Sequence, residues 1–291
     1  MRYISIALTL VLLAGLFSGC APSEAADIAA TTLPVYQFTQ RLCDGTGLTV
    51  TRLVTESVSC LHDYSLNVSQ VKAAESAEMI VLSGAGLENF LDDLLEGADT
   101  AIDSSKGLEL LTCEHSHGHE GHHHEHETDF HIWLSPANAK GMAANICAGL
   151  SREYPQHREV FESNLTALLA ELDALQAYGE ARLQDLACRE LVTFHDGFAY
   201  FAEAFNLTIL EAVEEESGSE ASAHELIHLI ELVRKHELPA IFTETNGSDS
   251  AARIISAETG VPVFSLDMAM GGEDYFEAMY HNIDTIGEAL G

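Results

Sequence analysis

Short apolar runs alternate along the chain with longer segments in which apolar residues recur at every third or fourth position. The short runs predict buried β-strands, and the longer periodic segments predict helices with one face in the core. The expected strands are "DIAATTL" (27–33), "LTVTRLV" (48–54), "EMIVLS" (78–83), "LELL" (108–111), "ELVTFH" (190–195), "LTILEAV" (207–213), "AIFTET" (240–245) and "VPVFSLD" (261–267). The expected helices cover residues 34–45, 67–77, 87–98, 135–154, 155–188, 197–206, 221–237, 248–260 and 274–290.

Regular alternation of strands and helices is typical of α/β proteins whose parallel sheets are covered on both faces. We therefore predict two doubly wound parallel-sheet lobes, at residues 21–154 and 189–291. The pattern from 155 to 188 predicts one long helix, and its place between the two halves makes it a rigid connecting helix. Ligands of doubly wound folds bind beyond the carboxyl ends of the strands, so we expect the functional site in the cleft between the lobes.

Residues 1–20 have the pattern of an export signal. Arg2 precedes an apolar run from Ile4 to Phe17 that is too short to span a bilayer comfortably. The run ends in "LFSGC", small residues followed by Cys20, which is typical of a bacterial lipobox in which the cysteine is lipidated. An ordinary cleavage site between Ala21 and Ala26 is the alternative. Because acyl chains attach proteins durably to membranes, we expect an extracytoplasmic, lipid-anchored protein.

The charge of the chain is strongly negative. Thirteen basic and forty-six acidic residues give a formal net charge of -33, which repels nucleic acid and attracts cations. Solubility alone also explains such a charge. The other five cysteines have no CxxC spacing and are odd in number, so one or two disulfides are allowed without a defined pairing. These cysteines are Cys43, Cys60, Cys113, Cys147 and Cys188.

Four residues of metal-binding type lie at the expected strand ends or in the loops that follow strands. His195 ends the first strand of the second lobe, and Asp267 ends the last strand of that lobe. His62 and His131 lie in two loops of the first lobe, each between a strand and a helix. Each of these residues alone is as well explained by a structural role. Together, three imidazoles and one carboxylate make a four-coordinate set that suits Zn²⁺.

At these residues the sequence resembles the zinc/manganese-type substrate-binding lipoproteins of ABC metal importers. The resemblance is carried, in order, by "HDYSL" (62–66), "DFHIWLSP" (129–136), "FHDGFAYFAEAFNL" (194–207), "IFTETNGS" (241–248) and "ETGVPVFSLD" (258–267). It covers essentially the whole chain after the export signal. It implies two similar α/β lobes, a backbone helix and one metal ion between the lobes, in a protein that is not an enzyme and acts as a monomer.

Carried over position by position, the resemblance places the metal ligands at His62, His131, His195 and Asp267. A histidine at position 195 resembles the zinc type, because manganese-type members commonly have a carboxylate there and nitrogen ligands favour Zn²⁺ over Mn²⁺. Fe²⁺ is a further alternative. The "MAM" that follows Asp267 departs from the usual pattern, which makes Asp267 the least secure ligand. The implied partner is the membrane permease of an ABC importer.

A histidine-rich tract at 114–127 precedes His131 and contains little that could be buried, so we expect a loop. Zinc-binding members of the family often carry such a loop, which implies loose, low-affinity metal binding; a passive tract is the alternative. Its histidines are His115, His117, His119, His122, His123, His124 and His126.

Two other functions are compatible with parts of this sequence. "HELIH" (224–228) matches the H-E-x-x-H pattern of secreted zinc metalloproteases. However, His224 and His228 share a helical stripe with Glu231 and Lys235, whereas Leu226, Ile227, Ile230 and Val233 form the stripe expected to be buried. The histidines should therefore lie on an outer face, without a third ligand. A role in cell adhesion or zinc buffering is the other alternative, and it would use the same cleft.

Overall fold

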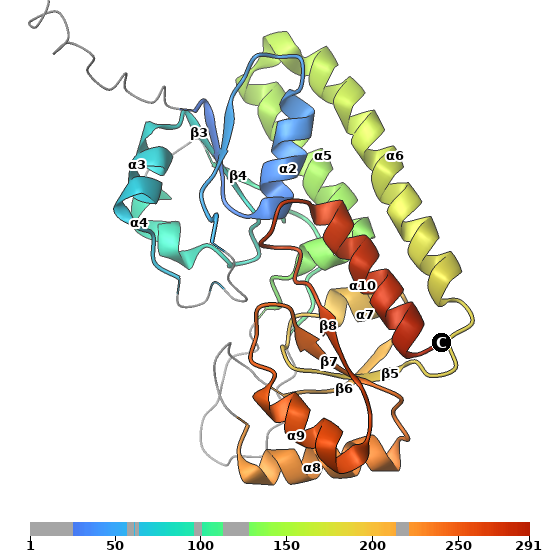
Figure 1. Ribbon diagram of the computed structural model, residues 1–291. Coiled ribbons are helices and arrows are strands. Elements are labelled where there is room, and N and C mark those ends of the chain that lie inside the picture. Colours follow the sequence, from blue (N-terminus) through green and yellow to red (C-terminus); the bar gives the residue numbers. More distant parts are fainter. Residues whose placement is uncertain (1–25, 57–60, 62–63, 96–100, 113–127, 214–220) are drawn as a thin grey trace, which may run out of the picture.

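Two four-stranded parallel sheets form the framework of the computed structural model, which describes residues 26–56, 61, 64–95, 101–112, 128–213 and 221–291 (Figure 1). The first sheet contains β1 (Ile28–Ala30), β2 (Val50–Arg52), β3 (Met79–Leu82) and β4 (Ala101–Asp103), in the order β2-β1-β3-β4. The second contains β5 (Glu190–Thr193), β6 (Thr208–Ala212), β7 (Ile241–Glu244) and β8 (Val263–Leu266), in the order β6-β5-β7-β8. The two lobes thus repeat one doubly wound topology, which confirms the predicted fold class.

Helices cover both faces of each sheet. In the first lobe they are α2 (Leu33–Cys43), α3 (Val68–Ser76), the short η2 (Asn89–Leu91) and α4 (Asp92–Leu95), and η3 (Ile132–Leu134) leads into α5 (Pro136–Glu153). The turn η4 (Pro155–His157) precedes α6 (Arg158–Leu183). The second lobe has α7 (Ala199–Ala204), α8 (Ala223–Lys235), α9 (Ser250–Thr259) and α10 (Tyr275–Ala289). Side-chain caps start several of them: Asn67 caps α3, Ser135 caps α5 and Ser222 caps α8.

Side chains of each strand alternate between two cores, as the pleat of a strand requires. In β1, Ile28 and Ala30 join the large central core, whereas Ala29 joins a smaller core beneath α3 and η2. In β5, Leu191 joins the central core and Val192 joins a separate core under α8 and α9. The central core contains residues from both lobes and from α5, α6 and α10, so one continuous apolar interior joins the two halves.

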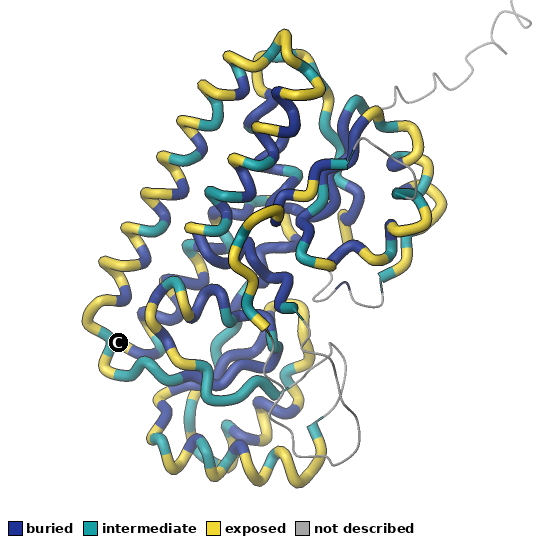
Figure 2. Tube along the Cα trace, turned by 180° about the vertical axis from the view of Figure 1, so that it is seen from behind, coloured by how far each residue is buried: buried dark blue, intermediate teal, exposed yellow. Residues whose placement is uncertain are grey.

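The long helix α6 runs along one side of the molecule and packs against α2, α5 and α10 (Figure 1). Its buried side chains fall on a single stripe, and its opposite face is exposed (Figure 2). The buried members of the stripe are Phe161, Leu168, Leu172, Leu175, Gly179 and Leu183. Gly179 is required for close approach, because a Cβ there would lie 2.2 Å from Cε1 of Phe205.

One element prediction in the first lobe was wrong, and one covers residues that are only partly described. "LELL" (108–111) is not a strand; the fourth strand is β4, whose Ile102 is buried and pairs with Val81 of β3. In this segment Leu110 is 40% exposed, whereas Leu108 and Leu111 are partly buried against the central core. The helix expected at 87–98 is limited, in its described part, to η2 and α4.

Three cysteines lie within the described ranges, and all three are free thiols: Cys43, Cys147 and Cys188. Burial raises the pKa of Cys43 to about 12, so this thiol is unreactive. Cys60 and Cys113 lie outside the described residues. Within the described ranges no helix combines the length and the apolar character that crossing a bilayer requires.

Candidate metal centre

The point where the strand order reverses lies between β5 and β7 in the second lobe. His195 follows the carboxyl end of β5 by two residues, and Glu244 is the last residue of β7. Doubly wound folds bind ligands in the crevice at such a switch point, because the loops on either side diverge there. His131 comes from the other lobe, where it immediately precedes η3 and α5.

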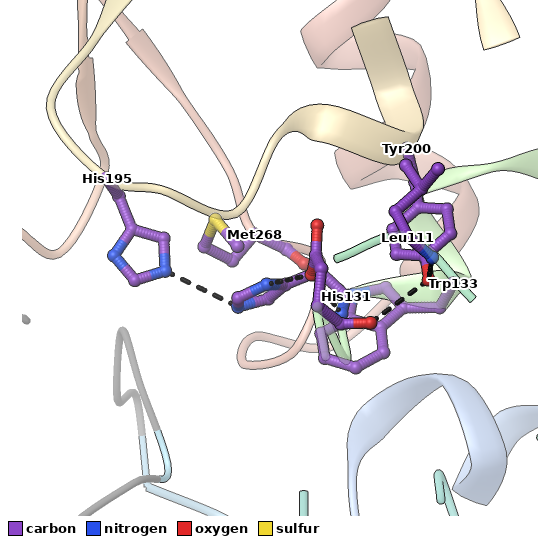
Figure 3. A network of polar contacts seen from close by, with 7 residues as sticks. Leu111, His131, Trp133, His195, Tyr200 and Met268 are labelled. Atoms are coloured by element: carbon purple, nitrogen blue, oxygen red, sulfur yellow. Dashed lines mark hydrogen bonds and ion pairs between the residues drawn. The ribbon is translucent and has the colours of Figure 1, made fainter. Parts of the chain in front are cut away.

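The structure brings His131 and His195 together, as Figure 3 shows. Their Nε2 atoms are 3.4 Å apart, and their rings are nearly perpendicular, with an interplanar angle of 88°. Two nitrogens bound at about 2.0–2.1 Å to one tetrahedral Zn²⁺ lie about 3.3–3.4 Å apart. The two Nε2 atoms therefore have the spacing of two ligands of a single zinc ion. Both rings are 3% exposed, so water has little access to them.

A carboxylate lies beside the Nδ1 atom of each ring. Asp129 Oδ1 accepts hydrogen bonds from the backbone N of His131 at 2.8 Å and from its Nδ1 at 2.9 Å. Glu244 Oε2 lies 3.9 Å from Nδ1 of His195. The hydrogen bond to Asp129 favours the tautomer of His131 that carries its proton on Nδ1 and leaves a lone pair on Nε2. The carboxylate of Glu244 places a negative charge near Nδ1 of His195.

Backbone and side-chain hydrogen bonds fix the segment that carries His131. The Tyr200 hydroxyl donates to the backbone oxygen of Asp129 at 3.0 Å and accepts from the backbone N of Leu111 at 2.8 Å. The indole Nε1 of Trp133 donates to the backbone oxygen of Met268 at 2.7 Å. Tyr200 belongs to α7, and Met268 lies in the loop after β8. The hydrogen bonds of Tyr200 and Trp133 therefore attach the His131 segment to the second lobe (Figure 3).

Asp267 lies directly after β8, as the sequence predicts. Its Oδ1 accepts a hydrogen bond from the backbone N of Ala269 at 2.7 Å, and its own backbone is bonded to the side chain of Asn282. Among the described residues, no group of three histidine, cysteine or carboxylate side chains comes together as a metal site. The structure thus brings together His131 and His195, while the role of Asp267 as a ligand stays a prediction.

The remaining predicted site residues lie outside the described residues. They are His62, the lipidation site Cys20, and the low-affinity histidines His115, His117, His119, His122, His123, His124 and His126.

The "HELIH" segment lies on α8. His224 and His228 are exposed, as expected, and Nε2 of His228 is 2.9 Å from Oε2 of Glu211. The predicted buried stripe was partly wrong: Ile227 is 59% exposed, and Leu229 is buried beside Val233.

Three residues near the histidine pair were not recognised from the sequence as parts of the site. They are Gly197, Met268 and Tyr200. Met268 belongs to the "MAM" segment after Asp267. The departure of this segment from the family pattern was the feature of the sequence that could have pointed to Met268. Tyr200 gave no signal, because an aromatic residue on an apolar helix face predicts only burial.

Two doubly wound lobes joined by a long helix define a two-lobed binding protein. The family model described as "Zinc-uptake complex component A periplasmic" matches residues 28–289, and the chain belongs to this family. Membership confirms the predicted resemblance, and the family description names a component of a zinc-uptake complex. The family description also places such components outside the cytoplasm, as predicted.

Individual relatives agree with this assignment. The zinc-binding lipoprotein AdcA of Streptococcus pneumoniae serotype 4 is 32% identical over 97% of this chain, which spans 60% of the length of AdcA. A putative metal-binding protein of Treponema pallidum is 30% identical over 78% of this chain and 76% of its own length.

Solved structures of the same family have the same fold. The crystal structure of ZnuA superposes with a TM-score of 0.79 at 32% identity, covering 91% of this chain and 100% of that chain. The Zn(II)-bound ZnuA-like domain of Streptococcus pneumoniae AdcA gives a TM-score of 0.76 at 27% identity, covering 91% and 98%.

Proposed function

We propose that this chain is the extracytoplasmic zinc-binding protein of an ABC importer, which captures Zn²⁺ and delivers it to a membrane permease. The observation that carries the proposal is the pair of buried Nε2 atoms of His131 and His195 at 3.4 Å. The names of the relatives support zinc as the ion. The chain spans 60% of the length of AdcA, so its role in import belongs to this proposal.

In this proposal the ligands of the transported Zn²⁺ are His62, His131, His195 and Asp267. The neutral imidazoles donate nitrogen lone pairs, and the carboxylate of Asp267 supplies negative charge. Asp129 holds the ring of His131 in the productive tautomer through its hydrogen bond to Nδ1, and the charge of Glu244 lies beside the ring of His195. Acid should weaken capture, because protons compete for the same nitrogen lone pairs.

Release involves limited movement of the lobes. The helix α6 and the continuous central core oppose a wide opening between the two halves. Docking on the permease would therefore release Zn²⁺ through a small tilt of the lobes and local loop movement.

Attachment to the membrane completes the proposal. Residues 1–20 act as an export signal, Cys20 carries the lipid, and a monomer faces the permease. The histidine-rich tract at 114–127 would hold further zinc loosely.

The proposal is tested by measuring zinc and manganese binding to the full chain in detergent, by competition with a chelator of known affinity. His131→Ala and His195→Ala should each weaken tight zinc binding by at least about tenfold, because each removes one of four ligands. His228→Ala on α8 is the matched control and should bind zinc as the parent chain does. Tight zinc binding that survives both cleft substitutions would refute the site.

A zinc buffer or an adhesin would bind zinc with the same residues. Deletion of the gene separates these functions from import, because only an importer component should be needed for growth when zinc is scarce. Normal zinc uptake after deletion, with no second importer present, would exclude the transport role.

A further inference from the structure

Gly197 lies against both histidines of the candidate site. It is buried and follows His195 by two residues, just before α7. A Cβ at this position would lie 2.6 Å from Cδ2 of His195 and 2.9 Å from Cε1 of His131. Real Cβ atoms do not approach carbon atoms so closely, so only glycine leaves room for the two rings.

A third side chain, that of Met268, borders the position that a Cβ of residue 197 would occupy. The methyl carbon of Met268 would lie 2.6 Å from a Cβ at position 197. Met268 is 3% exposed, and its thioether lies next to the two imidazoles in Figure 3. Cδ2 of His195 and Cε1 of His131 border the same position. Each of these carbons is bonded directly to the Nε2 of its own ring. Gly197 and Met268 therefore cover one side of the pair of metal-binding nitrogens.

The position of Met268 is fixed by its neighbours. Its backbone oxygen accepts the hydrogen bond from the indole of Trp133 at 2.7 Å. The next residue, Ala269, has a φ of 52°, which is uncommon for a residue with a Cβ, and its N–H is bonded to Asp267. This turn directs Met268 towards the histidines, although a non-glycine residue must adopt a left-handed conformation to form it.

We propose that Gly197 and Met268 form an apolar wall that sets the spacing of His131 and His195 and restricts the site to four-coordinate ions. The proposal rests on the metal-binding function proposed above. On this side of the nitrogens the described residues present the backbone of Gly197 and the thioether side chain of Met268, which would keep a water ligand from approaching. Zn²⁺ is satisfied by four ligands, whereas Mn²⁺ prefers six, largely oxygen. Gly197 is thus a positioning residue, and Met268 is a determinant of metal specificity.

The test compares zinc and manganese dissociation constants of the full chain and four variants by chelator competition, with circular dichroism and thermal unfolding as controls for folding. Gly197→Ala should weaken zinc binding by about 10–100-fold, the range for residues that support metal ligands. Gly141→Ala on α5 is the matched control: its Cβ would meet only the flexible side chain of Leu108 at 2.5 Å, in the first lobe. It should leave zinc binding unchanged.

Met268 is tested with two substitutions of different size. Met268→Ala removes the wall and admits water, so the preference for zinc over manganese should fall by about tenfold. Met268→Leu keeps an apolar side chain of similar volume and should retain that preference within about threefold.

The inference is overturned if Gly197→Ala folds and binds zinc like the parent chain, or if Met268→Ala keeps the parent preference for zinc. Should Gly197→Ala fail to fold, the two Met268 variants decide alone. Loss of zinc binding in His131→Ala with unchanged behaviour of the wall variants would refute this inference and leave the proposed function standing. Failure of the parent chain to bind zinc would refute the proposed function itself.

Discussion

At the scale of single residues, the candidate site depends on carboxylates that act through histidines. Asp129 accepts two hydrogen bonds from His131, one from the backbone and one from the ring, so it fixes both the path of the chain and the orientation of the imidazole. The carboxylate of Asp129 is buried together with the ring that it orients.

Replacement of this carboxylate should weaken metal binding although Asp129 is not itself a proposed ligand. Asp129→Ala removes the oxygen that accepts both hydrogen bonds, and we expect zinc affinity to fall by about 10–100-fold. The dissociation constant from chelator competition measures the effect. Asp173→Ala, which removes an exposed partner of Lys140 on the outer face of α6, is the control. Equal zinc affinity of the two variants would show that Asp129 has no part in the site.

The sequence predicted the residues of the pair better than their surroundings. His195 was recognisable as a metal-binding side chain beyond a predicted strand, whereas His131 was recognisable from the "DFHIWLSP" motif, because the strand predicted before it does not form. The contact between Gly197 and Met268 was not predictable, because it joins positions 71 residues apart that no local pattern relates. Such contacts depend on how two lobes pack, which a one-dimensional pattern does not contain.

At the scale of elements, one buried carboxylate holds the carboxyl ends of β1 and β3 together. Glu88 accepts hydrogen bonds from the Thr31 hydroxyl and from the backbone N atoms of Ser83 and Gly84. Burial raises the pKa of Glu88 to about 7, and the nearby charge of Asp103 raises this pKa further, whereas the three hydrogen bonds oppose the rise.

This raised pKa predicts how stability changes with pH. Between the ordinary pKa of 4.5 and about 7, the folded protein holds a proton on Glu88 that the unfolded chain has lost. The contribution of Glu88 to stability is therefore fully present below the unfolded pKa and is lost as the pH rises through the folded one. Urea unfolding at about pH 5 and about pH 8 should show a smaller loss of stability for Glu88→Gln than for the parent chain. If the parent chain and the Glu88→Gln variant lost equal stability between these pH values, the raised pKa of Glu88 would be contradicted.

Element boundaries were least predictable where apolar residues lie on the surface. "LELL" has the composition of a strand, yet a strand needs a neighbour with unpaired backbone groups, and β3 pairs with Ala101–Asp103 instead. Pairing is a property of the sheet, so the apolar run alone could not decide it. The alternation of strands and helices, by contrast, repeats in both lobes and was recognisable throughout.

At the scale of the whole molecule, the lobes share one interior. The central core runs from β1 and β3 through α5 and α6 to β8 and α10. The buried stripe of leucines on α6 contributes to this interior, and α6 packs against α2, α5 and α10.

A cavity in this shared interior should therefore destabilise both lobes together. Leu172 is fully buried on α6, and Leu172→Ala should lower the free energy of unfolding by about 2–5 kcal/mol. Thermal unfolding followed by calorimetry should show one transition at a lower temperature. The exposed Ala177→Ser on the opposite face is the control and should unfold as the parent chain does. Two separate transitions in the Leu172 variant would mean that the lobes unfold independently.

A shared interior also constrains how such proteins diversify. Half of the molecule cannot be exchanged with a relative as a module, since the transplanted half would have to fit the same buried seam of side chains. New preferences for ions must then arise in the short loops at the carboxyl ends of the strands. Even there the side chains are closely packed, because one added methyl group at position 197 would already collide with its neighbours.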